Sequence, residues 1–127
     1  MTDTADQSTL LHRFTASDDD LDAESLRKSS MLCGATAAGD CSRGELVDLY
    51  GRLRVVTHIP GGLNGATPTV EAELFDGTGS VTLIWLGRSV IAGIVAGRQL
   101  RVRGRIAVRE GRRVIYNPNY TLEAGAP

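Results

Sequence analysis

The chain has 127 residues, of which 42% are apolar, and its formal net charge is −1. This length fits one domain of ordinary size with one packed core, and it does not comfortably fit two. No run of about 18 apolar residues occurs and residues 1–10 are polar and acidic, so the sequence predicts neither a membrane helix nor a secretory signal, and we expect a cytoplasmic protein.

The small net charge hides a strong asymmetry between the two halves of the chain. Residues 1–50 carry ten acidic and four basic side chains, whereas residues 51–127 carry five acidic side chains and ten arginines. An acidic half joined to a basic half indicates polyanion binding by the basic half. It equally permits the acidic half to fold back over the basic half and screen its charge.

Residues 1–44 form an acidic N-terminal segment in which we expect one helix and a linker. Ser17 is a good helix N-cap, and the acidic residues that follow it suit the positive end of the helix dipole. A thin apolar face and a natural stop at Gly34 predict a weakly docked helix over residues 17–32. Residues 34–44 are small and polar, which is typical of a linker.

From residue 45 onward the hydrophobic period changes to two, which predicts strands. The expected strands cover residues 46–59, 69–75, 80–86, 99–109 and 112–117. Gly51 marks a bend in the first strand, and Asp76-Gly77-Thr78-Gly79 is a strong hairpin signal between the second and third. We expect a short helix over residues 88–94 and a flexible tail over residues 123–127.

This order of elements predicts an all-β domain over residues 45–122. Five strands, a bent first strand and a short helix between strands three and four match a small Greek-key barrel of the OB type. Such a sheet nearly closes on itself, which limits the exposed strand edges that promote aggregation.

Three stretches carry a resemblance to a known family: Gly51 to Leu53, Glu73 to Trp85, and Gly97 to Arg105. They resemble the nucleic-acid-binding OB domain and are similar to the OB modules of RecG-type helicases and class II aminoacyl-tRNA synthetases. Most of all, the chain resembles stand-alone OB-fold proteins of actinobacteria. A composition of 13 Arg and 1 Lys is compatible with a GC-rich genome.

The resemblance implies a module that binds single-stranded DNA or RNA with little sequence specificity. The catalytic motifs of helicases and synthetases are absent from the sequence, so the resemblance implies binding without chemistry. No cofactor and no metal is expected.

OB domains bind nucleic acid across strands two and three, between the loops that join strands one and two and strands four and five. Arginines supply charge for phosphates, and exposed aromatic rings stack on bases. The candidate nucleic-acid-binding residues are Arg52 and Arg54 on strand one, Phe75 on strand two, Arg101, Arg103 and Arg105 on strand four, and Arg109, Arg112 and Arg113 around the last turn. Alternatively, the turn is charged for solubility, and the strand-one arginines pair with Glu71 and Glu73 across strands.

The sequence does not predict an enzyme, because it contains no nucleophile–base arrangement, no phosphate loop and no metal cluster. Cys33 and Cys41 have no second pair and no nearby His, which favours free thiols over a metal site or a disulfide. The alternative function is a protein-interaction OB domain. In that case the acidic N-terminal segment either covers the barrel as an autoinhibitory element or contacts a basic partner.

Overall fold

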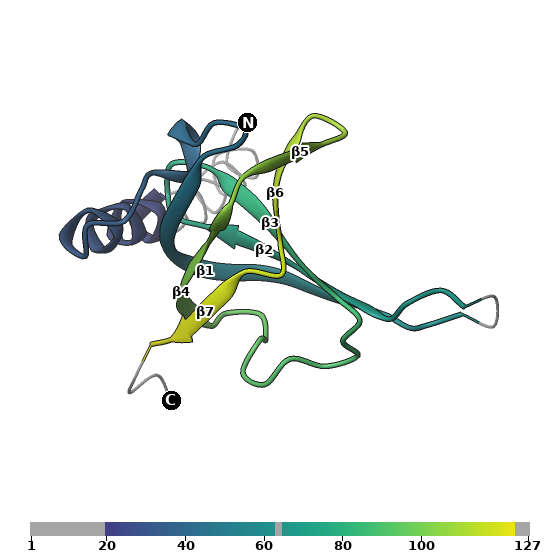
Figure 1. Ribbon diagram of the computed structural model, residues 1–127. Coiled ribbons are helices and arrows are strands. Elements are labelled where there is room, and N and C mark those ends of the chain that lie inside the picture. Colours follow the sequence, from purple (N-terminus) through teal and green to yellow (C-terminus); the bar gives the residue numbers. More distant parts are fainter. Residues whose placement is uncertain (1–19, 63–64, 124–127) are drawn as a thin grey trace, which may run out of the picture.

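The computed structural model describes residues 20–62 and 65–123, and β-strands are their main secondary structure (Figure 1). The N-terminal helix covers residues 20–32 within this part of the chain. The other elements are η1 (Ala38–Asp40), β1 (Leu46–Ile59), β2 (Thr69–Phe75), β3 (Ser80–Leu86), β4 (Gln99–Arg105), β5 (Ala107–Arg109), β6 (Arg112–Tyr116) and β7 (Asn119–Leu122). The predicted bounds of the first three strands are confirmed. The predicted start of the helix at residue 17 and the tail after residue 123 lie outside the described residues.

The long strand β1 organises the sheet, whose hydrogen-bonded order is β5-β6-β3-β2-β1-β4-β7. The first half of β1 pairs with β4 and the second half pairs with β2, both antiparallel. The register against β2 shifts between Leu53 and Val55, and a side chain at Gly51 would collide with the Phe75 carbonyl. The bulge and the glycine let β1 bend from one partner strand to the other, as the sequence predicts.

The structure corrects the five-stranded barrel that we expected, because the described residues form seven strands in an open order with β5 and β7 at its ends. The predicted strand 99–109 is interrupted at Ile106, whose side chain is buried. The Ile106 N–H donates to the Glu45 carbonyl at 2.8 Å, and its own carbonyl accepts the Gly44 N–H at 2.8 Å. These bonds take Ile106 out of the strand pairing and divide the strand into β4 and β5. After Pro118 the chain pairs with β4 again and adds β7.

The short helix that we predicted over residues 88–94 is also corrected, because residues 87–98 contain turns and no helix. Gly93 has a φ of 77° and Gly97 a φ of 90°, both in the left-handed region that favours glycine. A left-handed residue does not continue a right-handed helix. Ile91 and Ile94 are nevertheless buried in the core, so this segment closes one end of the sheet without helical structure.

Inward-facing side chains of the strands form one hydrophobic core, and two aromatic residues border it at the same end of the sheet. Trp85 is buried, and its Nε1 donates to the Pro118 carbonyl at 3.2 Å. The Tyr120 ring meets the Trp85 ring edge-on with centroids 5.8 Å apart, and the Tyr120 hydroxyl donates to the Ala92 carbonyl at 3.0 Å. These contacts hold the loop of residues 87–98 against the sheet.

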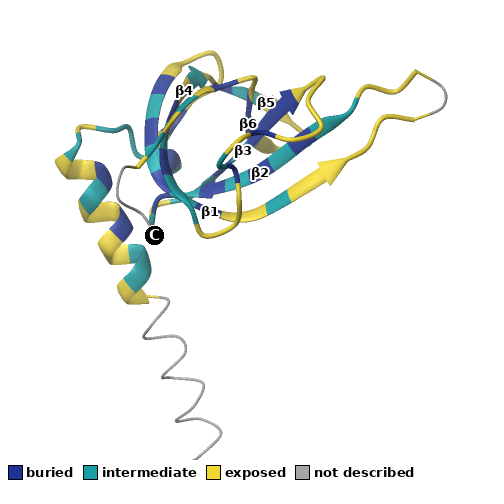
Figure 2. Ribbon diagram, turned by 90° about the horizontal axis from the view of Figure 1, so that it is seen from below, coloured by how far each residue is buried: buried dark blue, intermediate teal, exposed yellow. Residues whose placement is uncertain are grey.

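The N-terminal helix docks on the sheet beside the turn between β2 and β3 (Figure 2). Leu26 and Ser30 are buried on the inner side of the helix. A side chain at Gly77 would collide with the Ala23 carbonyl, so the glycine of the turn permits the helix to approach closely. One of the predicted binding residues, Arg52, forms an ion pair with Asp22 of the helix.

Part of the predicted linker belongs to the core. Ala38 and Cys41 are 1% and 5% exposed and lie in the same hydrophobic cluster as the strands. The Ala38 N–H donates to Asp76 Oδ2 at 2.7 Å, which joins η1 to the turn between β2 and β3. Small side chains gave this stretch the composition of a linker, but small side chains also allow close packing on the sheet.

Candidate nucleic-acid interface

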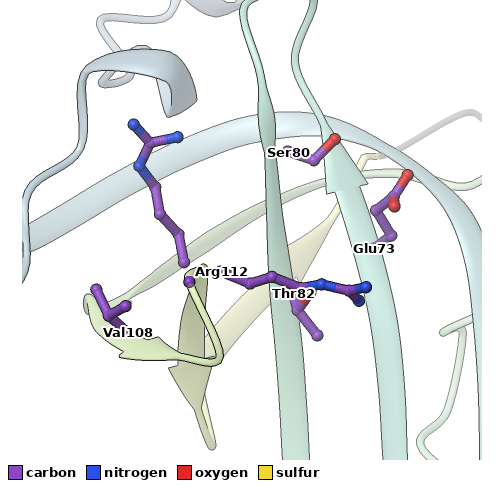
Figure 3. Close-up of a pocket in the computed structure, with 7 residues that line it drawn as sticks. Glu73, Ser80, Thr82, Val108 and Arg112 are labelled. Atoms are coloured by element: carbon purple, nitrogen blue, oxygen red, sulfur yellow. The ribbon is translucent and has the colours of Figure 1, made fainter.

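A groove lies between the outer face of β2 and β3 and the hairpin of β5 and β6 (Figure 3). Its largest hollow has a volume of about 590 Å³, which is within the range of ligand sites in proteins. This hollow is lined by Glu73, Ser80, Thr82, Val108, Gly111, Arg112 and Arg113. Two further hollows of about 180 and 190 Å³ share Thr82 and Arg112 with it, so the three are adjacent. We call them together the hairpin groove.

A tight turn places two arginines at the edge of the hairpin groove. Glu110 and Gly111 form the tip of the hairpin with φ values of 53° and 76°, and Arg109 pairs with Arg112 across the strands. Both arginines are exposed, and neither side chain has an ion pair or a hydrogen bond to another described residue. Arg112 borders all three hollows and extends from the hairpin toward β3 (Figure 3). The two guanidiniums are therefore free to bind an anion in the groove.

Arg113, the third arginine predicted at this turn, is engaged in the fold. Its Nε donates to the Cys41 carbonyl at 2.9 Å, and its Nη2 donates to the Gly39 carbonyl at 2.9 Å. The guanidinium therefore ties β6 to the η1 segment, although the residue also borders the largest hollow. The bidentate use of its donors leaves fewer of them for a phosphate.

The floor of the hairpin groove is acidic on its β2 side. Glu71 and Glu73 both line it, and Glu73 pairs with Arg54 at 3.8 Å. The Arg54 guanidinium also lies over the Phe75 ring, 3.6 Å from its centroid. The expected cross-strand pairing is thus confirmed for Arg54 and Glu73. The ring that we predicted as a stacking platform for bases is covered by an arginine in this structure.

The arginines of β4 lie outside the lining of the hairpin groove. Arg101 donates to both carboxylate oxygens of Asp48, at 2.7 and 3.1 Å, and this hydrogen bonding raises the pKa of Arg101. Arg105 donates to the Gly44 carbonyl at 2.7 Å. Arg103 is exposed and has no ion pair among the described residues. Of the nine predicted residues, only Arg109, Arg112 and Arg113 therefore line the hairpin groove.

Sequence reasoning missed the neutral residues of the groove. Ser80 and Thr82 point outward from β3, and Val108 comes from β5. The alternation of β3 already put Ser80 and Thr82 on the face opposite the core, so the pattern contained this signal. Val108 is exposed, although valine side chains are most often buried.

Cys33 and Cys41 are both free thiols in this structure, and no group of three His, Cys, Asp or Glu residues in its described part lies close enough together to hold a metal ion. Burial, and then the charge of Glu45, raises the pKa of the Cys41 thiol to about 11. No helix within the described residues is long and apolar enough to span a bilayer.

Comparison with known proteins adds information on the fold. No family model and no curated relative matches the sequence. A structure of RecG bound to a three-way DNA junction is similar over 71% of this chain, with 23% identity and a TM-score of 0.58. A replication protein A heterotrimer bound to single-stranded DNA is similar over 72% of this chain and 73% of that one, with 15% identity and a TM-score of 0.49.

The similarity to RecG spans only 13% of the length of that protein. It therefore concerns one domain and not the whole helicase. At this level of identity the similarity identifies the fold and leaves the ligand open. The resemblance to the OB domains of RecG-type helicases is confirmed as a resemblance of fold.

Proposed function

We propose that this chain is a non-catalytic nucleic-acid-binding OB module that holds a single strand of DNA or RNA in the hairpin groove. The observation that carries the proposal is the pair Arg109 and Arg112, which border the hairpin groove and whose side chains have no partner among the described residues. The other arginines near the groove already bind carboxylates, carbonyls or an aromatic ring. The RecG structure of similar fold was determined with DNA, which is in keeping with this choice of ligand.

In this proposal the two parts of a nucleotide lie on different sides of the groove. One guanidinium can bind two oxygens of a phosphate, so the phosphate backbone of the nucleic acid follows the hairpin that carries Arg109 and Arg112. Carboxylates repel phosphates, so Glu71 and Glu73 keep the backbone away from β2. The bases then point toward the β2 and β3 face, where Thr82 and Ile84 lie.

The mixed charge of the groove sets the strength of the salt dependence. Two phosphate contacts on a single strand give a log–log slope of about −1.4, since each contributes about −0.7. A strand held by all eight predicted arginines would show a far steeper slope. We therefore expect weak salt dependence and modest affinity.

Fluorescence anisotropy of the full chain with a labelled mixed-sequence strand, first DNA and then RNA, tests the proposal. We expect binding in the micromolar range at about 50 mM salt that weakens about sevenfold at about 200 mM salt. The absence of binding to both strands at the lower salt concentration would contradict the proposal.

The protein-interaction function remains the second candidate, and one observation favours it. Leu21, Met31 and Leu32 on the outer side of the docked helix are 63%, 73% and 88% exposed. Exposed apolar side chains on one element are typical of protein contact sites. This candidate predicts that oligonucleotides produce no salt-dependent response and that a protein partner is lost when these three side chains become polar.

A further inference from the structure

We propose that Glu71 makes the hairpin groove selective for guanine over thymine and uracil, by accepting hydrogen bonds from the Watson–Crick edge of a base. The inference rests on the proposed function, because it concerns a strand that is already bound in the groove. It goes beyond that function because an OB module that binds through phosphates and stacking alone has little base preference.

Glu71 is the carboxylate on the sheet side of the groove that has no ion pair among the described residues, and the second unpaired carboxylate of the same hollow, Glu110, is exposed at the hairpin tip. Glu71 lies in the ladder between Thr57 of β1 and Ile84 of β3, and it lines both of the smaller hollows. It has no ion pair within residues 20–62 and 65–123, whereas the neighbouring Glu73 is held by Arg54. A half-buried carboxylate without a charged partner has its acceptors available to a ligand.

The hollow around Glu71 has the size and the walls for a single base. Its volume is about 180 Å³, and the buried side chains of Ile84 and Val114 border it on the side of β3 and β6. Arg112 borders the same hollow, and its planar guanidinium can stack on a base while Arg109 holds the phosphate. The base edge that enters this hollow meets the carboxylate of Glu71.

The chemistry of the four base edges then decides the preference. An ionised carboxylate only accepts hydrogen bonds, so it binds best where two donors are adjacent. Guanine presents N1–H and the N2 amino group side by side on its Watson–Crick edge, whereas cytosine and adenine present one amino group next to an acceptor nitrogen. Thymine and uracil flank their single N3–H with two carbonyls, which the carboxylate repels. Guanine is therefore preferred, and thymine and uracil are rejected.

Anisotropy measurements with strands of about 12 nucleotides test this inference with the full chain. The host strand is all thymine, and a matched strand carries isolated guanines, in a lithium buffer that prevents guanine quadruplexes. Two further strands replace guanine by inosine, which lacks the N2 amino group, or by 7-deazaguanine, which lacks the N7 acceptor. We expect guanine and 7-deazaguanine strands to bind about tenfold more tightly than thymine, and inosine to lose most of this gain.

The variant Glu71→Gln assigns the preference to one residue. Its amide presents one acceptor and one donor group, so we expect the ratio of guanine to thymine affinity to fall close to one, even though loss of a negative charge strengthens binding of both strands. Glu24→Gln is the matched control, since Glu24 lies on the helix and pairs only with Lys28 in the described residues. We expect this control to keep the wild-type ratio.

The possible results separate this inference from the proposed function. If no strand binds, both the proposed function and the selectivity are overturned. If all strands bind the wild-type chain equally, binding stands and the selectivity is overturned. A guanine preference that survives Glu71→Gln, or that is lost with 7-deazaguanine and kept with inosine, would show that an arginine reads the N7 edge and would overturn the role of Glu71.

Discussion

The carboxylate of Asp76 accepts the backbone N–H of Ala38 at 2.7 Å, across 38 residues of sequence. The side chain of Asp76 is fully buried, and its other oxygen accepts the N–H and hydroxyl of Thr78 at 2.9 and 2.7 Å and the N–H of Gly79 at 3.2 Å. One carboxylate thus shapes the turn between β2 and β3 and fixes η1 to it. The turn motif read from the sequence is therefore also a tertiary contact.

Replacing this carboxylate should destabilise the whole domain. In Asp76→Asn the amide group has an acceptor on only one side, so at least one buried donor loses its partner. We expect the free energy of unfolding to fall by about 3 kcal/mol. Urea unfolding should show a lower midpoint at unchanged slope. The exposed Asp40→Asn in η1 is the control, and equal midpoints for the two variants would contradict the role given to Asp76.

The folding unit should begin before residue 45. A chain of residues 36–127 keeps η1, whereas a chain of residues 45–127 loses Ala38 and Cys41, and with them one hydrogen-bond partner of Asp76 and both carbonyl partners of Arg113. We expect the shorter chain to be less stable than the longer one by roughly 3 kcal/mol, from lost core packing and unpaired buried groups. Thermal unfolding followed by circular dichroism measures the difference. Identical transitions would place the boundary at residue 45 after all.

Adjacent arginines should have separate roles. Arg113→Ala removes two hydrogen bonds to carbonyls, so we expect a loss of about 2 kcal/mol in stability. Arg112→Ala removes an exposed side chain, so we expect a stability change within about 0.5 kcal/mol but about fivefold weaker binding of a single strand. Unfolding and anisotropy measured on both variants check this division. A large stability loss in Arg112→Ala would refute it.

The fold was predictable wherever local patterns determine structure. Alternation placed β1, β2 and β3 correctly, because every second residue is buried along β2, along most of β3 and in β1 as far as Leu53. The predictions of a continuous strand over residues 99–109 and of a helix over residues 88–94 failed because contacts with distant parts of the chain determine the local structure there. Ile106 leaves its strand because Gly44 and Glu45 bind its backbone, and the positive φ at Gly93 is a consequence of how residues 87–98 cover the core. Neither the hydrogen bonds of Ile106 nor the conformation of Gly93 can be predicted from the few residues around it.

The candidate site was likewise predictable only where local sequence determines it. The two-residue turn at Glu110 and Gly111 places the arginines at its ends together, and this much follows from the sequence. The sequence does not reveal which arginines are already occupied. Arg101 binds Asp48 from 53 residues away and Arg113 binds Cys41 from 72 residues away, so their availability depends on the tertiary fold.

Alkaline pH should destabilise the protein through Cys41. Its pKa is about 11 in the folded state and 9.0 as an ordinary thiol, because burial disfavours the thiolate. The folded state therefore keeps a proton that the unfolded chain releases. The contribution of this pKa difference to the free energy of unfolding is complete below pH 9 and is lost as the pH rises toward about 11. We expect the wild-type chain to lose more stability than Cys41→Ala between these pH values in urea unfolding, and parallel curves would contradict the assignment.

Thiol labelling gives an independent check on the same residue. Cys33 is half-buried and Cys41 is buried, so an alkylating reagent at neutral pH should modify Cys33 first. We expect modification of Cys41 only when the domain opens, and mass spectrometry of the labelled peptides distinguishes the two. Equal labelling rates in the folded protein would show that the η1 segment opens frequently.

NMR chemical-shift mapping with a single-stranded oligonucleotide tests the central claim most directly, because each backbone amide reports its own contact with the ligand. The account predicts that the largest changes occur at Thr82, Gly111 and Arg112, which line the hairpin groove, and that the amide of Arg103 on β4 changes little. Changes concentrated on β4 or on the N-terminal helix, with the hairpin groove unaffected, would contradict it.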